Sequence, residues 1–351
     1  MEQNAANALL GKTLTTGWKV IEKFEKGDND TGSFFSVCYK VEKDNEICFM
    51  KAYDFTKFFQ IRDPNSSFVD VVSDMITAYK YERDLSIHCK SKHVTKVLFV
   101  KDSGEESVPN YSVSIVPYLI FDMADGDVRK KLHFTKNLDS AWRLKSLHDI
   151  SVGLMQLHKI EVSHQDLKPS NILVFNTDSK LGDLGRSMCK AVEGPYNNMT
   201  FTGDFTYAPP EIMYQYYEKD WLKRVFATDC YLLGSMIVFY FSGISMSVLL
   251  KNNLSQIFWY ENWRGTYDEL KDYLVDAFSK ALIEFEENVK ENILKDELRI
   301  LVEYLCHPLP EKRGHPKNIL SKYSNYNLER FVNLLDIAKR KAELIVKSET
   351  Y

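Results

Sequence analysis

The sequence predicts an α+β protein with a small, β-rich N-terminal lobe and a larger, mostly helical C-terminal lobe. Residues 17–54 contain three apolar, strand-like runs that are separated by polar turn segments. After residue 127 the apolar residues recur at three- and four-residue steps, as they do on the buried face of a helix. This change of periodicity places the boundary between the lobes near residues 122–128. The 351 residues are enough for one large bilobal domain or two ordinary ones, with a sizeable core in either case.

The first elements of the N-terminal lobe are predicted to be strands over residues 18–21, 34–41 and 47–52. A short polar segment, residues 42–45, separates the second and third strands and predicts a hairpin turn. Residues 68–90 follow with apolar side chains at helical spacing. The pattern therefore predicts a helix with one apolar face.

Two more strands are predicted over Val94–Val100 and Val113–Phe121, joined by a polar loop over Lys101–Asn110. Residues 140–158 are amphipathic and predict the first long helix of the C-terminal lobe. Residues 268–306 repeat apolar side chains at three- and four-residue steps among charges, which predicts further helices. The expected organisation is an N-terminal extension, an N-lobe, a C-lobe and a flexible C-terminal tail, at residues 1–16, 17–124, 125–345 and 346–351.

The stretch Tyr231–Leu250 carries no charged residue and is about as long as a membrane span. Several serines and two glycines interrupt it, and Asp229 stands just before it. We therefore expect a buried core helix that is followed by a turn near Gly243, and no membrane partner.

The composition is that of a globular protein of near-neutral charge. The net charge of −4 offers no overall positive field for a nucleic acid or an anionic membrane. The six cysteines form no CxxC pair and have no histidine at metal-ligand spacing, which favours free thiols in a reducing compartment. The first residues lack the basic start and apolar run of a signal peptide. We expect a cytoplasmic protein.

Three residues in order offer the oxygen ligands that phosphate-transfer chemistry needs. Asp166 follows the strand-like Val162-Ser163, Asn171 lies five residues later, and Asp183 lies twelve residues beyond that. Two carboxylates and one amide near a hairpin suit Mg²⁺, which prefers oxygen ligands. A single aspartate in a loop is more often a turn cap, but the complete spaced set favours a catalytic centre.

The segment His164–Asn171 resembles the catalytic loop of the eukaryotic-type Ser/Thr protein kinases. The tripeptide Asp183-Leu184-Gly185 resembles the metal-binding motif of the same family. The resemblance extends over about residues 17–320. It implies a bilobal kinase fold, ATP and Mg²⁺ as cofactors, and a protein as the phosphate acceptor.

The resemblance also implies a role for each residue of this centre. Asp166 would orient the acceptor hydroxyl and accept its proton, while Asn171 and Asp183 would hold Mg²⁺. Lys168 would neutralise the charge that develops on the transferred phosphate, and a lysine at this position indicates Ser/Thr acceptors.

The resemblance assigns Lys51, in Phe49-Met50-Lys51-Ala52, to the phosphates of ATP. Its partner on the following helix would be Glu82, although a solvent-exposed helix charge is the alternative for that residue. Asp122, Met123 and Ala124 would form the hinge that meets adenine, and Asp127 would bond the ribose.

The glycine-rich loop that should cover the phosphates is incomplete. Gly32 and Ser33 stand where the family places this loop, and Val37 follows them, but Phe35 occupies the position of the third glycine. A lone glycine in a hairpin is ordinarily a turn residue. We expect Gly32, Ser33 and Val37 to contact the nucleotide.

Three further residues are implied to support the site from the C-lobe. Glu211, at the end of the activation segment, would form a buried ion pair with Arg313. Asp229 would bond the backbone of the catalytic loop. Two further positions depart from the family: Gln165 stands where an arginine normally reads a phosphorylated activation segment, and Asp204 stands where a threonine is usual.

Three functions remain open at this point. The first is an active Ser/Thr protein kinase, which the complete set of catalytic residues favours. The second is a pseudokinase that acts as a binding module, which the weak glycine loop favours. The third is a small-molecule phosphotransferase of related fold, although such enzymes generally lack a motif like the one that ends in Glu211. The helical region 251–306 is longer than the family core requires. It is a candidate surface for a protein partner, and filler between core helices is the alternative.

Overall fold

The computed structural model describes most of the chain. The described residues are 4–25, 36–56, 67–111, 113–135, 138–320 and 324–349. Gly32 and Ser33, which were predicted to contact the nucleotide, lie outside these ranges.

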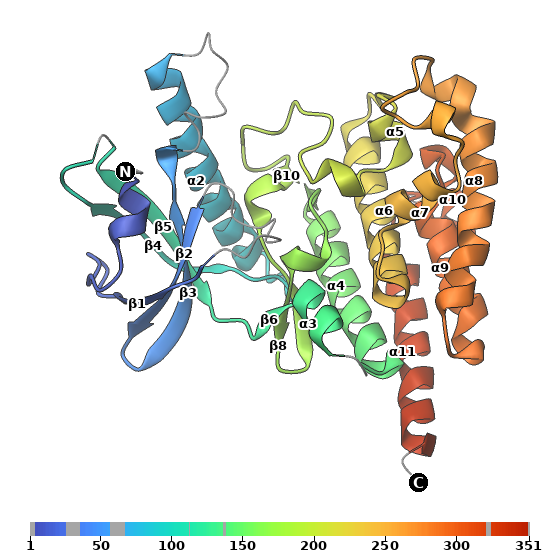
Figure 1. Ribbon diagram of the computed structural model, residues 1–351, viewed down its shortest axis with the longest axis horizontal. Helices are drawn as coiled ribbons and strands as arrows, with labels where there is room; N and C mark the ends of the chain where they lie inside the picture. The colour runs from blue at the N-terminus through green and yellow to red at the C-terminus, as the bar shows by residue number, and fades with distance from the viewer. Residues whose placement is uncertain are drawn as a thin grey trace.

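The N-terminal lobe is built on one antiparallel sheet of five strands, in the order β1-β2-β3-β5-β4 (Figure 1). The three predicted N-terminal strands are present, and β2 and β3 pair residue for residue from Ser36–Tyr53 to Lys43–Glu46. The central position of β3 matters because this strand carries Lys51. The strands are β1 (Lys19–Lys23), β2 (Ser36–Lys43), β3 (Glu46–Tyr53), β4 (Val100–Ser107) and β5 (Ile115–Asp122).

The prediction of a strand over Val94–Val100 followed by a loop over Lys101–Asn110 is wrong. Strand β4 starts where the predicted strand ends, and its polar residues pair with β5 at the edge of the sheet. An edge strand with one solvated face tolerates polar side chains, so its apolar signal is weak. The apolar residues of 94–98 are buried at the junction of the lobes instead, where the Leu98 N–H donates to the Leu181 carbonyl at 2.7 Å.

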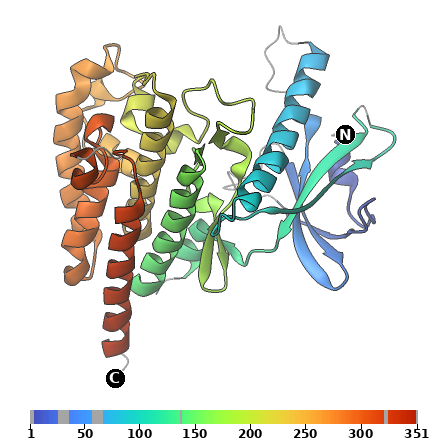
Figure 2. The ribbon, with the colours of Figure 1, turned by 180° about the vertical axis from the view of Figure 1, so that it is seen from behind.

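Helix α2 (Phe68–Ser91) is the long helix of this lobe, as the spacing predicts. A capping box at its start, formed by Ser67 and Asp70, satisfies backbone donors of the first turn. Met75, Tyr79 and Glu82 lie on its buried side. The helix stands beside the sheet and reaches toward the C-lobe in both views (Figures 1 and 2).

The predicted N-terminal extension packs into the core of the N-lobe where it is described. Ala6 and Leu9 are buried with Tyr39, whose hydroxyl donates to the Ala6 carbonyl at 2.6 Å. The Gly11 N–H donates to the Val20 carbonyl at 2.9 Å. This segment therefore covers the sheet rather than standing apart from it.

The C-terminal lobe is mostly helical, with short strand pairs at the face that meets the N-lobe (Figure 1). Strands β6 (Gly126–Asp127), β8 (Ile172–Phe175) and β9 (Asp178–Leu181) form one small sheet, and β7 (Val162–Ser163) pairs with β10 (Met188–Cys189). The longer helices are α4 (Ser140–Lys159), α6 (Trp221–Ser242), α8 (Tyr267–Asn288), α9 (Asn292–Cys306) and α11 (Glu329–Glu349), and the shorter ones are α3 (Val128–Phe134), α5 (Pro210–Met213), α7 (Met246–Asn252) and α10 (Pro316–Ile319).

Helix α6 confirms the prediction of a buried core helix. It ends at Gly243, which adopts φ 79°, and α7 follows after a short turn. Among the described helices, α6 alone is long and apolar enough to cross a membrane, and 78% of that window is buried inside the protein. The apolar composition is thus explained by its position in the core of the C-lobe.

Helix α11 runs to Glu349, which lies beyond the predicted end of the C-lobe at residue 345. The start of the predicted flexible tail, 346–351, is therefore helical. Ala342 is buried and Ile345 and Val346 are half-buried, so the apolar face of the helix continues past the predicted boundary. The division between the lobes at residue 124 stays a prediction.

Candidate active site

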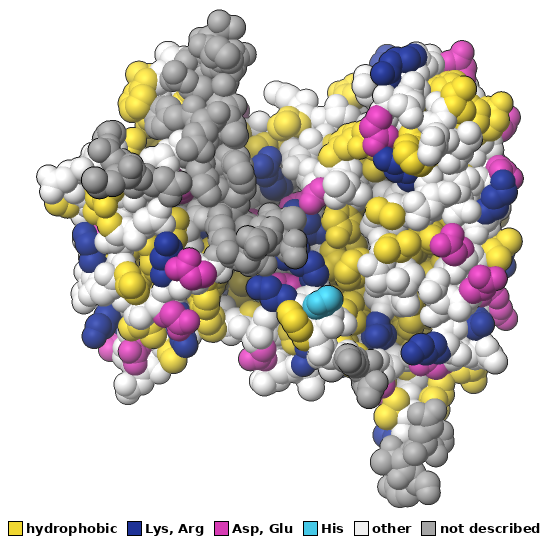
Figure 3. Space-filling view, viewed as in Figure 1, with side chains coloured by type: hydrophobic (Ala, Val, Ile, Leu, Met, Phe, Trp, Pro, Cys, Tyr) yellow, Lys and Arg dark blue, Asp and Glu magenta, His cyan; other side chains and the backbone are white. Residues whose placement is uncertain are grey.

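The two lobes meet at a cluster of charged residues around Lys51. Its amino group lies 2.8 Å from Glu82 Oε2 and 3.0 Å from Asp183 Oδ1. Lys51 comes from β3, Glu82 from α2, and Asp183 from the turn after β9. Glu82 is therefore a partner of Lys51 and not a solvent-exposed helix charge. Basic and acidic side chains lie in the depression between the lobes in Figure 3.

The protonation of this cluster follows from burial and charge. Burial disfavours the charged form of Lys51, but Asp183 and Glu82 outweigh it and raise the pKa of Lys51 well above its usual value. Burial would raise the pKa of Asp183, but the attraction of Lys51 outweighs it and lowers the pKa of Asp183. At neutral pH a cation and a carboxylate thus stand together at the junction of the lobes.

The catalytic-loop residues also come together. The Asn171 Nδ2 donates to the Asp166 carbonyl at 2.8 Å and to Asp166 Oδ2 at 2.9 Å. The Lys168 amino group lies 3.3 Å from Asp166 Oδ2. Burial raises the pKa of Asp166, against the opposing charge of Lys168. A carboxylate with a raised pKa is better suited to accept a proton near neutral pH.

Asn171 and Asp183 fit the metal that the sequence predicts. The amide nitrogen of Asn171 donates to Asp166, so the amide oxygen of Asn171 is left to act as an acceptor or ligand. Asp183 is half-buried and adopts φ 57°, a left-handed backbone that turns the chain sharply after β9. Carboxylate and amide oxygens are the ligands that Mg²⁺ takes in proteins.

The backbone of the catalytic loop is held by Asp229, as the sequence predicts. Its Oδ2 accepts from the His164 N–H and its Oδ1 from the Gln165 N–H, both at 2.8 Å. Asp229 is fully buried at the start of the apolar half of α6. Burial would raise the pKa of Asp229, but hydrogen bonds that include one from His158 lower it. The loop therefore rests on a buried carboxylate.

Gln165 points into the C-lobe core. It is fully buried, and its backbone adopts φ 64°. Its side-chain amide nitrogen, Nε2, donates to Ser163 Oγ at 2.7 Å and to the Val225 carbonyl at 3.1 Å. The amide nitrogen is thus satisfied by local acceptors, whereas the buried Gln165 Oε1 has no hydrogen-bond partner among the described residues. Gln165 offers no positive charge to a phosphate on the activation segment.

Asp204 ties the activation segment to the catalytic loop. Its backbone N–H donates to Asp166 Oδ1 at 2.8 Å, and its Oδ2 lies 3.4 Å from the Lys168 amino group. Its Oδ1 accepts from the hydroxyl of Thr206 at 2.7 Å. The residue that departs from the family pattern thus contacts both the predicted base and the predicted lysine.

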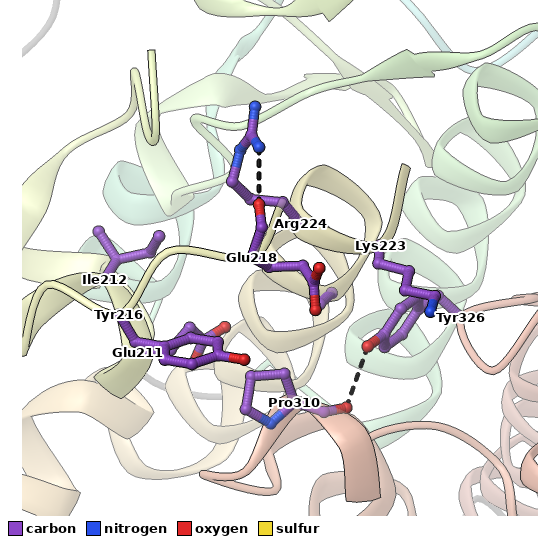
Figure 4. Close-up of a pocket in the computed structure, with 9 residues that line it drawn as sticks. Glu211, Ile212, Tyr216, Glu218, Lys223, Arg224, Pro310 and Tyr326 are labelled. Atoms are coloured by element: carbon purple, nitrogen blue, oxygen red, sulfur yellow. Dashed lines mark hydrogen bonds between the residues drawn. The ribbon is translucent and has the colours of Figure 1, made fainter. Parts of the chain in front are cut away.

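Glu211 and Arg313 form a buried, bidentate ion pair, as the sequence predicts. The two nitrogen–oxygen distances are 2.6 and 2.9 Å. Arg313 has no exposed surface and Glu211 is 5% exposed. Figure 4 shows the surroundings of Glu211, where the Tyr326 hydroxyl donates to the Pro310 carbonyl at 3.1 Å. This pair fixes the end of the activation segment to the helical lobe.

The predicted hinge leads from β5 into the C-lobe. The Asp122 carboxylate is exposed and lies 3.1 Å from the Lys101 amino group, while Met123 and Ala124 are half-buried. The Asp127 side chain accepts from the Lys130 N–H at 2.9 Å and so caps α3. The contacts of these residues with adenine and ribose stay predictions.

Val37 is the described residue of the predicted nucleotide-covering loop. It is 7% exposed and pairs with Ala52 on the neighbouring strand, beside Lys51. Its contact with a nucleotide stays a prediction.

Tyr53 belongs to the cluster around Lys51, although the sequence motifs did not predict it. Its hydroxyl donates a short hydrogen bond to Glu82 Oε2, the same oxygen that accepts from Lys51. Side chains two residues apart on a strand point to the same face, so the spacing of Lys51 and Tyr53 was the signal that could have found it.

Gly185 lies close to the carboxylate of Glu82. A β-carbon at this position would stand 2.8 Å from Glu82 Oε2 and 3.2 Å from Asp183 Oδ1. Gly185→Ala should therefore displace Glu82 from Lys51 and lower activity by about 10- to 100-fold, because displacements of about 1 Å can have effects of this size. Steady-state rates and the melting temperature of the variant would be measured together. Wild-type rates would show that the two carboxylates have room to move.

A protein-family model described as "Protein kinase domain" matches residues 38–323, which is well over half of the chain. The chain belongs to the protein kinase domain family. The match spans both the Lys51 cluster and the catalytic loop, and the five-stranded sheet followed by a helical region is the fold of this family.

Relatives of this kinase domain include several protein kinases. The Aurora kinase of Yarrowia lipolytica is 27% identical over 171 residues, which cover 45% of this chain and 43% of that protein. The inhibitor of nuclear factor kappa-B kinase subunit alpha of Danio rerio is 30% identical over 141 residues, 38% of this chain and 18% of that protein. The serine/threonine-protein kinase greatwall of Xenopus tropicalis is 30% identical over 115 residues, 32% of this chain and 12% of that protein. The chain thus matches less than half the length of each of these relatives.

Proposed function

We propose that this kinase domain is an active Ser/Thr protein kinase that transfers the γ-phosphate of ATP to a protein hydroxyl. The observation that carries the proposal is the convergence of Lys168 and Asn171 on the Asp166 carboxylate, at 3.3 and 2.9 Å. A carboxylate held in this way can accept a proton, while the lysine beside it can neutralise developing negative charge.

Each residue of the site has a place in this proposal. ATP supplies the phosphoryl group, and Mg²⁺, when bound, neutralises charge on its phosphates. Lys51 would contact the phosphates, and Asn171 and Asp183 would hold the metal. Asp166 would orient the acceptor hydroxyl and take its proton.

The choice of acceptor rests on Lys168 and on the relatives. Lys168 lies between two carboxylates, Asp166 and Asp204, so its amino group is held at the place where the acceptor must approach. One relative is named a serine/threonine-protein kinase. Both observations support serine or threonine as acceptors.

The test is phosphate transfer from radiolabelled ATP in the presence of Mg²⁺, with the Asp166→Ala variant as the background. The acceptors are a serine- and threonine-containing peptide mixture, a tyrosine-only peptide mixture and a mixture of small hydroxyl metabolites. We expect label on the first mixture only, and its loss when EDTA removes the metal.

Three other results would each contradict the proposal. Label on the tyrosine mixture alone would mean that the acceptor is tyrosine and not serine or threonine. Label on a metabolite alone would favour a small-molecule phosphotransferase. Absence of label on every acceptor and on the protein itself, although ATP with Mg²⁺ raises its melting temperature, would favour a pseudokinase.

A further inference from the structure

The carboxylate of Glu82 is held by two donors that come from one strand. Lys51 and Tyr53 stand two residues apart on β3 and point to the same side of the sheet. Glu82 Oε1 lies 3.1 Å from the Lys51 amino group, and Glu82 Oε2 accepts both from this group at 2.8 Å and from the Tyr53 hydroxyl. Helix α2 is thus joined to the sheet through one charged donor and one neutral donor.

Tyr53 is enclosed where this contact forms. It is 5% exposed, and its ring packs edge-on against Tyr79 of α2 with a centroid separation of 5.4 Å. The Lys51 amino group lies 5.6 Å from the centroid of the Tyr53 ring. A buried hydrogen bond to a carboxylate has little competition from water and is stronger than one on the surface.

Glu82 has a competitor for Lys51. The amino group of Lys51 is shared with Asp183, whose Oδ1 lies 3.0 Å away. A lysine on a flexible stem can follow either carboxylate. The Tyr53 hydroxyl does not contact Asp183 in any described hydrogen bond, so it favours the position of Glu82 alone.

We propose that Tyr53 is a positioning residue for phosphate transfer: its hydroxyl holds Glu82, and with it helix α2, in the place where Glu82 orients Lys51. This inference rests on the proposed function, because Lys51 must act on the phosphates of ATP. In this proposal Tyr53 acts through Glu82. The contact joins β3 to α2 directly, without a residue of the activation segment.

The test compares Tyr53→Phe with Tyr79→Phe. The first change removes only the hydroxyl that reaches Glu82, and it keeps the ring that packs on α2. The second removes the hydroxyl of Tyr79, the other ring of the pair. This hydroxyl donates to the Gly104 carbonyl at 3.4 Å. We expect kcat to fall at least about tenfold in Tyr53→Phe, because a hydrogen bond to a charged group commonly contributes enough for such a change. Tyr79→Phe should stay within about threefold of wild type.

Hydrogen exchange of the α2 amides gives a second measurement that does not need activity. Exchange should become faster in Tyr53→Phe than in Tyr79→Phe. In a Glu82→Gln background, Tyr53→Phe should add much less to exchange, because the charged acceptor of its hydroxyl is gone. This cycle separates a role through Glu82 from a general loss of packing.

The inference would be overturned if Tyr53→Phe left both kcat and α2 exchange at the level of Tyr79→Phe. It would also be overturned if Tyr53→Phe had the same effect on exchange with and without Glu82. If the wild-type protein transfers no phosphate, the proposed function fails. The hydrogen-exchange cycle alone then tests whether the Tyr53 hydroxyl holds α2 through Glu82. The two failures are therefore distinguishable.

Discussion

Replacing Asp166 by asparagine should lower the rate of phosphate transfer by about 10²- to 10⁴-fold, the range expected for loss of a general base. Asparagine has nearly the same shape but cannot accept the proton of the acceptor hydroxyl. In the wild-type protein both Asp166 oxygens accept hydrogen bonds, from the Asp204 N–H at 2.8 Å and from the Asn171 Nδ2 at 2.9 Å. Asparagine has an NH₂ group in place of one of these oxygens, so one of the two donors loses its acceptor. Initial rates at saturating ATP and Mg²⁺ measure the effect.

Two controls separate chemistry from folding in the Asp166→Asn variant. Asp268→Asn makes the same chemical change on the surface, where the Asp268 side chain is 71% exposed and pairs with Lys271, and it should leave the rate unchanged. ATP with Mg²⁺ should still raise the melting temperature of Asp166→Asn, because nucleotide binding does not need the base. A rate within threefold of wild type would remove Asp166 from the role of base.

Replacing Arg313 by alanine should lower the free energy of unfolding by about 3–5 kcal/mol, because it leaves the buried carboxylate of Glu211 without its partner. Arg313 also donates to the Ala227 and His307 carbonyls, at 2.8 and 3.0 Å, so the change orphans backbone acceptors as well. Urea unfolding followed by circular dichroism gives the difference, provided that the denaturant slope is unchanged.

Arg340→Ala is the matched control for Arg313→Ala. The Arg340 side chain is 73% exposed and lies 2.8 Å from Asp336, so its loss should change stability by no more than about 1 kcal/mol. If Arg313→Ala did not fold, Glu211→Gln should still show a loss, because it weakens the same pair and keeps the volume. Equal effects of Arg313→Ala and Arg340→Ala would mean that burial adds nothing to the ion pair.

Much of the candidate site could be predicted because its residues are close in sequence. Asp166, Lys168 and Asn171 lie within one loop, so local chain geometry brings their side chains together. Helical spacing likewise predicted α4, and a long uncharged stretch predicted the buried helix α6. Local spacing failed at strand β4, since an edge strand with a solvated face carries little apolar signal.

Contacts between distant segments could not be predicted in the same way. The Tyr53 hydroxyl meets Glu82 across 29 positions of the chain, and the Asp204 N–H meets Asp166 across 38. Strand periodicity places Tyr53 on the face of Lys51, but it does not say which residue of α2 stands opposite. That depends on how the helix packs on the sheet.

The sequence alone determined the bilobal α+β organisation, through its periodicity, and the oxygen and nitrogen groups of the catalytic loop, through their short spacing. The resemblance of its motifs to those of known kinases indicated the family. Only the tertiary structure decided that Glu82 shares one oxygen between Lys51 and Tyr53, and that Asp204 contacts both Asp166 and Lys168. The reason is physical: such contacts depend on the burial and relative placement of whole elements, to which every packed side chain of α2, β3 and the activation segment contributes.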